Sequence, residues 1–202
     1  MQAVMDNFTN FAAIMKQMIV ILTLLACSLT GHAQAAFKLQ QTGTFVTAEG
    51  NDYAVIAFEG KKAEELYQMV KDNVAKYYES PEDVLTEEPH TKLTVEGFNR
   101  EFLMWTFMMV PTQFGALYTL TFQFKDGRIR VDAPEIDDTM MATATFGKKG
   151  ATASFKSMLN TYFRNGEVKE KAKPKVAAIE QHINDMINRL LTQESPKAED
   201  DW

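Results

Sequence analysis

One short turn constrains the fold of this chain more than any other feature of its sequence. Residues 118–133 read YTLTFQFKDGRIRVDA, and Asp126-Gly127 is a favoured type I′ turn because both central residues need positive φ. This turn places Phe124 opposite Ile129, so that the apolar pairs share one face and the polar pairs the other. A slip of one residue would reverse every side chain. Turn and pattern therefore agree on a β-hairpin with one buried and one wet face.

A strand and a long helix are predicted before the hairpin. Residues 53–58 (YAVIAF) form a β-branched and aromatic run after a turn at 49–52. Beyond Gly60, apolar residues recur at three- and four-residue steps from 61 to 79, which predicts an amphipathic helix. Ser80-Pro81 ends this helix, because a residue before proline avoids the helical conformation.

Three further strands are expected between this helix and the hairpin. Residues 84–88 and 92–97 are joined through Pro89-His90-Thr91, and the second segment alternates like a strand with one wet face. Residues 104–110 (MWTFMMV) do not alternate. We therefore expect a strand that is buried on both faces or covered on one face by the C-terminal segments, and that ends at Pro111.

Two helices complete the predicted domain. Ser154 caps the first, which Asn165-Gly166 ends, and Pro174 begins the second. The element order is strand, helix, five strands and two helices. It predicts an α+β domain over residues 37–192, with an antiparallel sheet of about five strands and helices on one face. We expect residues 193–202 to form a disordered polar tail.

The N-terminal residues 1–36 read as a leader followed by an export signal. Lys16 precedes an apolar run over 18–26, and small residues close the segment, as in a secretory signal peptide. The run is shorter than the about 20 apolar residues that a membrane span needs. The sequence therefore predicts an exported protein without a permanent transmembrane anchor.

Two routes of processing remain open. Cleavage after Ala33, the preferred route, leaves Gln34 at the new terminus of a periplasmic or secreted protein. Alternatively, residues 24–27 (LLAC) resemble a lipobox, in which case Cys27 is lipidated and the protein is an outer-membrane lipoprotein. Under the second route the protein meets a membrane, and under the first it does not.

Three short segments carry a resemblance to a known family: Glu65-Leu66-Tyr67, Val84-Leu85, and Lys125-Asp126-Gly127-Arg128 with the strand after it. In these residues the chain resembles the domain of unknown function 4468 family, exported proteins of Bacteroidetes-type bacteria with a fold like that of the TATA-binding protein. The resemblance covers residues 53–133. It departs from the family at Gly60, where a serine helix cap is common. It implies a TBP-like fold but no catalytic residue and no DNA binding, because fold does not fix function.

Composition excludes several kinds of chemistry. The 202-residue chain has a formal net charge of −6 and a single cysteine, Cys27. A chain cut after Ala33 therefore has no disulfide and no thiolate. Nucleic acid attracts basic surfaces, so an acidic chain argues against it as a partner. Glycine-rich phosphate loops are absent from the sequence, and we expect no cofactor.

Histidines and acids form no recognisable site. His90 and His182 have no second histidine at i+3 or i+4, so we expect both to be solvent-exposed and predict no metal site. The acids of the loop after the hairpin lack calcium-loop spacing and read as a solvated loop; they are Asp132, Glu135, Asp137 and Asp138. No catalytic residue is predicted, although a hydrolase with carboxylates assembled in space stays an alternative.

Two groups of side chains are candidates for binding. The first is a partly basic patch on the wet face of the hairpin: Gln123, Lys125, Arg128 and Arg130. An ordinary solvated face is the preferred interpretation of this patch. Lys125 opposite Arg128 is mildly unfavourable, which slightly favours an anionic neighbour, and Asp126 or solvent could supply it. The second is a cluster suited to irregular ligands, for which core packing is the preferred interpretation: Met104, Trp105, Phe107, Met108, Met109 and Phe114.

We therefore expect an exported, non-catalytic binding or assembly module of the bacterial cell envelope. Its expected partners are envelope proteins or an anionic ligand, with no nucleic acid and with a membrane only if Cys27 is lipidated. A carrier of a hydrophobic ligand and the hydrolase above are the alternatives.

Overall fold

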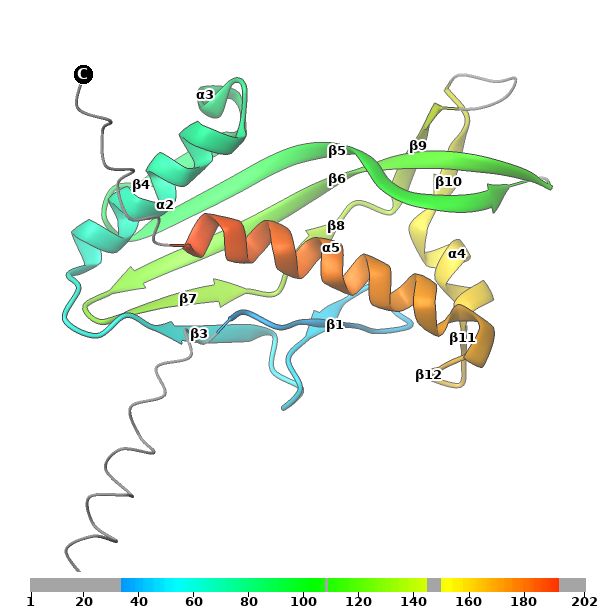
Figure 1. Ribbon diagram of the computed structural model, residues 1–202, viewed down its shortest axis with the longest axis horizontal. Coiled ribbons are helices and arrows are strands. Elements are labelled where there is room, and N and C mark those ends of the chain that lie inside the picture. The colour runs from blue at the N-terminus through cyan, green and yellow to red at the C-terminus, as the bar shows by residue number, and fades with distance from the viewer. Residues whose placement is uncertain (1–33, 108, 145–149, 193–202) are drawn as a thin grey trace, which may run out of the picture. The chain divides into compact units, whose positions relative to one another are not determined.

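The computed structural model of this chain describes residues 34–107, 109–144 and 150–192 (Figure 1). Residues 1–33 of the predicted leader, which include Cys27 and Ala33, and the predicted tail lie outside these residues. No helix among the described residues is long and apolar enough to cross a membrane.

The main sheet is built on two long antiparallel strands, β5 (Lys92–Phe107) and β6 (Val110–Lys125). The shorter strands around them also pair antiparallel: β3 (Tyr53–Ala57), β4 (Leu85–Glu88), β7 (Arg128–Asp132), β8 (Glu135–Ile136), β9 (Thr139–Ala144) and β10 (Thr152–Ser154). At one end of the sheet the strands follow the order β5-β6-β7-β3. Over another part of β6, strand β9 pairs with β6, and β10 pairs with β9. The α+β class with an antiparallel sheet is confirmed, with eight strands in this sheet where about five were expected.

Two small ribbons lie apart from this sheet. One joins β1 (Lys38–Leu39) to β2 (Phe45–Val46), and the other joins β11 (Phe163–Arg164) to β12 (Glu167–Val168). The second ribbon turns at Asn165-Gly166, where both residues have positive φ.

The apolar run 104–110 is where prediction and structure differ most. It holds the end of β5, a reversal beside Met109 (φ +67°) and the start of β6. The expectation of one buried strand was wrong, because an apolar run does not reveal a turn inside it. The predicted strand 92–97 is therefore only the first part of β5, which continues past an irregularity between Asn99 and Leu103.

Three helices form where the sequence predicted them: α2 (Ala63–Tyr77), α4 (Phe155–Tyr162) and α5 (Lys173–Leu191). Two short helical segments were not predicted: α3 (Pro81–Val84) and the 3-10 turn η1 (Glu170–Ala172). The Ser154 hydroxyl accepts a 3.0 Å hydrogen bond from the Ser157 N–H, which is the predicted cap of α4.

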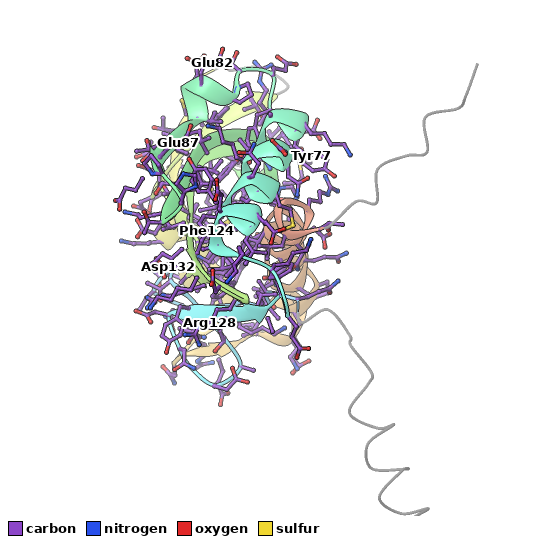
Figure 2. All side chains as sticks on the ribbon, turned by 90° about the vertical axis from the view of Figure 1, so that its left-hand side faces the viewer. Tyr77, Glu82, Glu87, Phe124, Arg128 and Asp132 are labelled. Carbon is purple, nitrogen blue, oxygen red and sulfur yellow. The ribbon has the colours of Figure 1, made fainter. Side chains whose placement is uncertain are left out.

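The core lies between the sheet and helices α2 and α5. Alternate side chains of β6, from Phe114 to Phe124, point into it and are buried. Leu66 and Val70 of α2 and Ile183 of α5 are fully buried against them. Figure 2 shows the domain from the side, with α2 on one side of the sheet and Asp132 on the other. Burial on one face leaves the other face of the β5-β6-β7-β3 region open, and the candidate site lies there.

Candidate functional site

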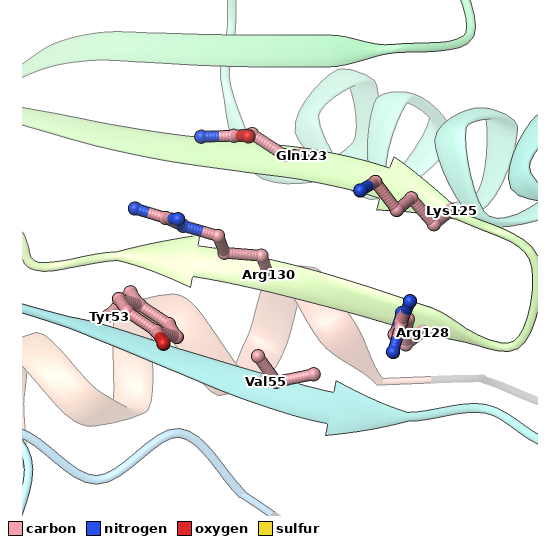
Figure 3. Close-up of a pocket in the computed structure, with 6 residues that line it drawn as sticks. All are labelled: Tyr53, Val55, Gln123, Lys125, Arg128 and Arg130. Carbon is pink, nitrogen blue, oxygen red and sulfur yellow. The ribbon is translucent and has the colours of Figure 1, made fainter. Parts of the chain in front are cut away.

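The four residues predicted from the hairpin alternation lie together in one surface pocket, here called the basic pocket (Figure 3). Gln123 and Lys125 come from β6, and Arg128 and Arg130 from β7. The pocket has a volume of about 240 Å³, and its side chains project from the sheet face opposite α5. Its full lining is Tyr53, Val55, Gln123, Lys125, Arg128 and Arg130.

The predicted register explains why these side chains meet. Lys125 lies opposite Arg128, and Gln123 opposite Arg130, as the Asp126-Gly127 turn requires. Strand β3 then pairs with β7 and places Val55 beside Arg130. The pocket therefore spans three neighbouring strands.

Arg130 is held in place by its neighbours. Its guanidinium carbon lies 4.1 Å from the centre of the Tyr53 ring, a cation–π contact. Its Nε donates a 2.6 Å hydrogen bond to Asp132, and Gln123 donates to the other oxygen of Asp132 at 2.9 Å. The bond to Asp132 is the main cause that raises the pKa of Arg130. Arg130 is thus oriented and partly neutralised.

Lys125 and Arg128 form no ion pair within the described part of the chain. Asp126, which lies between them in the sequence, is engaged elsewhere. Its carboxylate accepts bonds from Lys62 Nζ at 2.8 Å and from the Ala63 N–H at 2.9 Å. The Lys62 bond, followed by the Ala63 bond, lowers the pKa of Asp126. The two facing cations therefore receive no carboxylate from their own turn.

Asp126 acts as a cap for helix α2. The helix begins after Lys62, and the Ala63 N–H is one of the first-turn donors that lack a partner within a helix. Two backbone bonds of 2.8 Å, from Phe58 to Gly127 and from Gly127 to Lys61, hold the turn against the start of the helix. The residue at the cap position of α2 is Lys62, and Asp126, a residue distant in sequence, supplies an acceptor oxygen for the first turn.

The chemistry that the basic pocket supports is binding. Three of its six lining residues are cations, and none carries a carboxylate, imidazole, thiol or aliphatic hydroxyl. The chain as a whole has a net charge of −6, so the pocket is a local reversal of sign. Arginine presents a planar fork of donors that matches carboxylate or phosphate oxygens.

The two histidines differ in their surroundings. His90 is exposed in a turn, as predicted, with φ of +61°. His182 is half-buried, which corrects the expectation of exposure; its ring lies edge-on to Phe102 and hydrogen-bonds with Asn99. Burial, and next the charge of Arg189, lowers the pKa of His182, while Asp185 opposes them. Among the described residues, no three His, Cys, Asp or Glu side chains gather as a metal site would require.

The acids after the hairpin make different local hydrogen bonds. Asp132 lies beside the basic pocket, whereas Asp137 accepts from the Thr139 N–H at 2.6 Å. Asp138 accepts from the Ser154 hydroxyl at 3.0 Å and from the Lys156 N–H at 2.7 Å, so it supports the start of α4. Asp132, Asp137 and Asp138 therefore each have a partner in the local structure.

Only part of the methionine and aromatic cluster packs in the core. Phe114 is fully buried and Trp105 half-buried, but Met104 is 57% exposed and Met109 95% exposed. The core interpretation was wrong for these two methionines, because they lie near the reversal between β5 and β6. The remaining residues of the cluster, Phe107 and Met108, have no described side chains.

Sequence reasoning missed Tyr53 and Val55 of the basic pocket. Both are exposed and alternate with the half-buried Ala54 and the buried Ile56. That alternation could have placed them on a wet face. It could not have shown that β3 lies beside β7, because that pairing joins segments far apart in the sequence.

Comparison with known proteins gives structural neighbours only. No family model matches the chain, and no curated protein matches it. A TBP-like protein from Parabacteroides distasonis ATCC 8503 is similar at 12% identity and a TM-score of 0.49, over 68% of this chain and 87% of that one. A DUF4468 family protein from Bacteroides ovatus ATCC 8483 is similar at 9% identity and a TM-score of 0.49, over 84% of this chain and 95% of that one. The two neighbours bear the family and fold names that the resemblance in residues 53–133 indicated.

Proposed function

We propose that this protein is an exported, non-catalytic binding module whose basic pocket holds an acidic segment of a cell-envelope partner. One observation carries the proposal: Lys125 and Arg128 face each other in register, while Asp126 is engaged by Lys62 and Ala63. Like charges directly opposite each other on neighbouring strands are destabilising. A bound carboxylate would offset this repulsion, and among the described residues no carboxylate pairs with Lys125 or Arg128.

The strand geometry favours an extended segment as the ligand. Arg128 and Arg130 are two residues apart on β7 and therefore project from the same face, at a spacing of about 6.6 Å. An extended peptide presents its alternate side chains at the same spacing. Alternate Asp or Glu residues could therefore reach both guanidinium groups, with Tyr53 and Val55 beside them as apolar contacts.

The pocket is better suited to a segment of a polymer than to an enclosed small molecule. Small-molecule sites bury most of their ligand's surface, whereas this pocket lies on a sheet face with its side chains projecting outward (Figure 3). Export rests on the n-region, apolar run and small residues of the leader. The proposal is placed at the basic pocket, rather than at the methionine cluster or the loop acids, because facing cations without an ion pair are found there.

The test is binding of a labelled peptide in which Glu and Ser alternate, with a Gln-Ser peptide of equal length as the ligand control. We expect saturable binding of the Glu-Ser peptide that weakens as salt is added. The double substitution Lys125→Gln with Arg128→Gln should weaken binding by about tenfold or more, because charge-assisted hydrogen bonds are lost.

A matched variant separates this site from general charge attraction. Lys156→Gln with Lys171→Gln removes the same charge from two exposed lysines outside the pocket and should leave the affinity unchanged. Equal loss in both double variants, or equal binding of the Gln-Ser peptide, would contradict the proposal.

A further inference from the structure

Strand β3 forms an edge of the main sheet. On one side it pairs with β7, and no other strand of the described chain pairs with it on the opposite side. The strand reads YAVIA and contains no charged residue, no proline and no bulge. Charged side chains, prolines and bulges are the usual means by which proteins protect a sheet edge from added strands. The outer side of β3 is therefore open to another strand.

The register of β3 on β7 shows which backbone groups point outward. Just beyond the two ends of the pairing, the Ala133 N–H donates to the Asp52 carbonyl at 2.7 Å, and the Phe58 N–H donates to the Gly127 carbonyl at 2.8 Å. Bonded and unbonded pairs alternate along an antiparallel ladder, so the even-numbered residues of β3 bond to β7 and the odd-numbered residues face away from it. The residues with outward N–H and C=O groups are Tyr53, Val55 and Ala57.

The same residues carry the exposed side chains of β3. Tyr53 and Val55 line the basic pocket on the open face of the sheet (Figure 3). In an antiparallel pair, residues directly opposite each other project their side chains from the same face. An added antiparallel strand bonded to Tyr53 and Val55 would therefore place alternate side chains on the open face, beside the Arg130 guanidinium that lies over the Tyr53 ring.

The N-terminal segment of the domain does not close this edge, because its backbone bonds to helix α5. The Asn188 side chain accepts from the Ala35 N–H at 2.9 Å and donates to the Ala35 carbonyl at 3.0 Å. Asn184 does the same for Phe37, at 2.8 and 3.0 Å. Within the described residues no backbone hydrogen bond joins this segment to β3. The outward groups of β3 therefore stay available to a ligand.

Charge identifies the kind of strand that fits this edge. Neighbouring strands lie about 4.8 Å apart, so an added strand would lie about 10 Å from β7, and an acidic side chain on it could meet an arginine of β7 above β3. Strand β4, which forms another edge of the sheet, reads LTEE, and its Glu87 and Glu88 would repel an acidic strand. A second copy of this chain suits β3 poorly, because two β3 edges side by side would bring two basic pockets together.

We propose that the acidic partner segment binds as an added antiparallel strand on the outer side of β3. Its backbone bonds to Tyr53, Val55 and Ala57, and its alternate acidic side chains lie over the basic pocket, where Arg128 and Arg130 hold them. Backbone bonds of this kind provide affinity, and the pocket provides specificity for acids at every second position. The inference rests on the proposed function and specifies how that ligand is held.

The first test compares the Glu-Ser peptide with two N-methylated forms of it, each added to the full chain. In the antiparallel arrangement the peptide residues that bond to β3 lie directly opposite its outward residues, so they are the Glu residues. Methylation of every Glu nitrogen should weaken binding by about tenfold or more, because those N–H donors are lost. Methylation of every Ser nitrogen should leave the affinity unchanged, because those N–H groups point away from β3.

The added strand and the proposed function fail in different ways in this test. Equal affinities of the two methylated peptides, or a greater loss for the Ser-methylated form, would overturn the added strand while leaving the basic pocket as the binding site. Absence of binding by the unmodified Glu-Ser peptide would overturn the proposed function, and this inference with it.

A substitution in β3 tests the same edge from the protein side. Ala57→Pro removes one outward N–H, and Ala57 does not line the pocket. Proline is accepted on edge strands whose N–H faces solvent, so the unfolding midpoint should stay close to that of wild type. Binding of the Glu-Ser peptide should weaken by roughly fivefold, whereas the control Ala57→Ser should bind as wild type does. Unchanged binding by a folded Ala57→Pro variant, or a peptide-free wild-type dimer that Ala57→Pro dissociates, would contradict the inference.

Discussion

The two faces of strand β6 differ in character, although successive residues of one strand supply them in turn. Leu120 and Phe122 point toward α2 and α5 and are fully buried. Their neighbours Gln123 and Lys125 point to the open face and line the basic pocket. The buried face is held by packing, while the open face contains cations that packing does not require. Stability and binding are therefore assigned to opposite faces, and substitutions one residue apart should separate them.

Shortening a buried side chain of β6 should have the largest effect. Phe122→Ala should lower the free energy of unfolding by about 3–5 kcal/mol, through lost apolar burial and the cavity left behind. Thr121→Ala, on the opposite face of the same strand, should change it by less than about 0.5 kcal/mol. Chemical denaturation measures both, and similar losses would show that the open face is also part of the core.

Filling the space above a glycine on the buried face should have an intermediate effect. A Cβ added at Gly97 would lie 2.4 Å from the Tyr118 hydroxyl oxygen, which bonds to the Tyr78 hydroxyl at 2.7 Å. Gly97→Ala should therefore cost about 1–3 kcal/mol through overpacking.

The tyrosine pair provides a second measurement for the same variant. Burial is the main cause that raises the pKa of both Tyr118 and Tyr78. If Gly97→Ala displaces Tyr118, an ultraviolet titration should show tyrosine ionising at lower pH than in wild type. An unchanged titration together with full stability would show that the backbone, rather than Tyr118, gives way.

A smaller effect should appear on acidification, at His182 of α5. Burial lowers the pKa of His182 in the folded chain. Between this lowered pKa and the pKa of about 6.5 in the unfolded chain, the imidazole is protonated mainly in the unfolded state. Stability should therefore fall as the pH drops from about 6.5 through the lowered folded pKa. His182→Gln should flatten this part of the stability curve, and the matched variant His90→Gln should retain it. A curve that His182→Gln leaves unchanged would assign the acid sensitivity to other groups.

The smallest effect on stability should come from the basic pocket itself. Lys125→Gln with Arg128→Gln removes two facing like charges, so the unfolding midpoint should stay the same or rise slightly. The same variant should lose binding of the acidic peptide. A marked loss of stability would mean that these cations support the fold, and the contrast between the two faces would then fail at this point.

Local sequence signals predicted the hairpin and the helices because short-range geometry decides both. The Asp126-Gly127 turn set the register that the structure shows, from Lys125 opposite Arg128 to Phe122 opposite Val131. The reversal beside Met109 was missed, because its residues are apolar and carry no turn signal. Half-burial of His182 was also missed, because Asn99 and Phe102 come from a strand distant in sequence.

By itself, the sequence determined the alternation of β6 and β7, and with it four of the six residues of the basic pocket. Tertiary structure alone decided that Tyr53 and Val55 join them, that Asp126 caps α2 instead of neutralising Lys125, and that Asn188 holds Ala35. The physical reason is the range of the interactions. A two-residue turn specifies its own register, whereas a hydrogen bond between Ala35 and Asn188 joins residues that only the folded chain brings together.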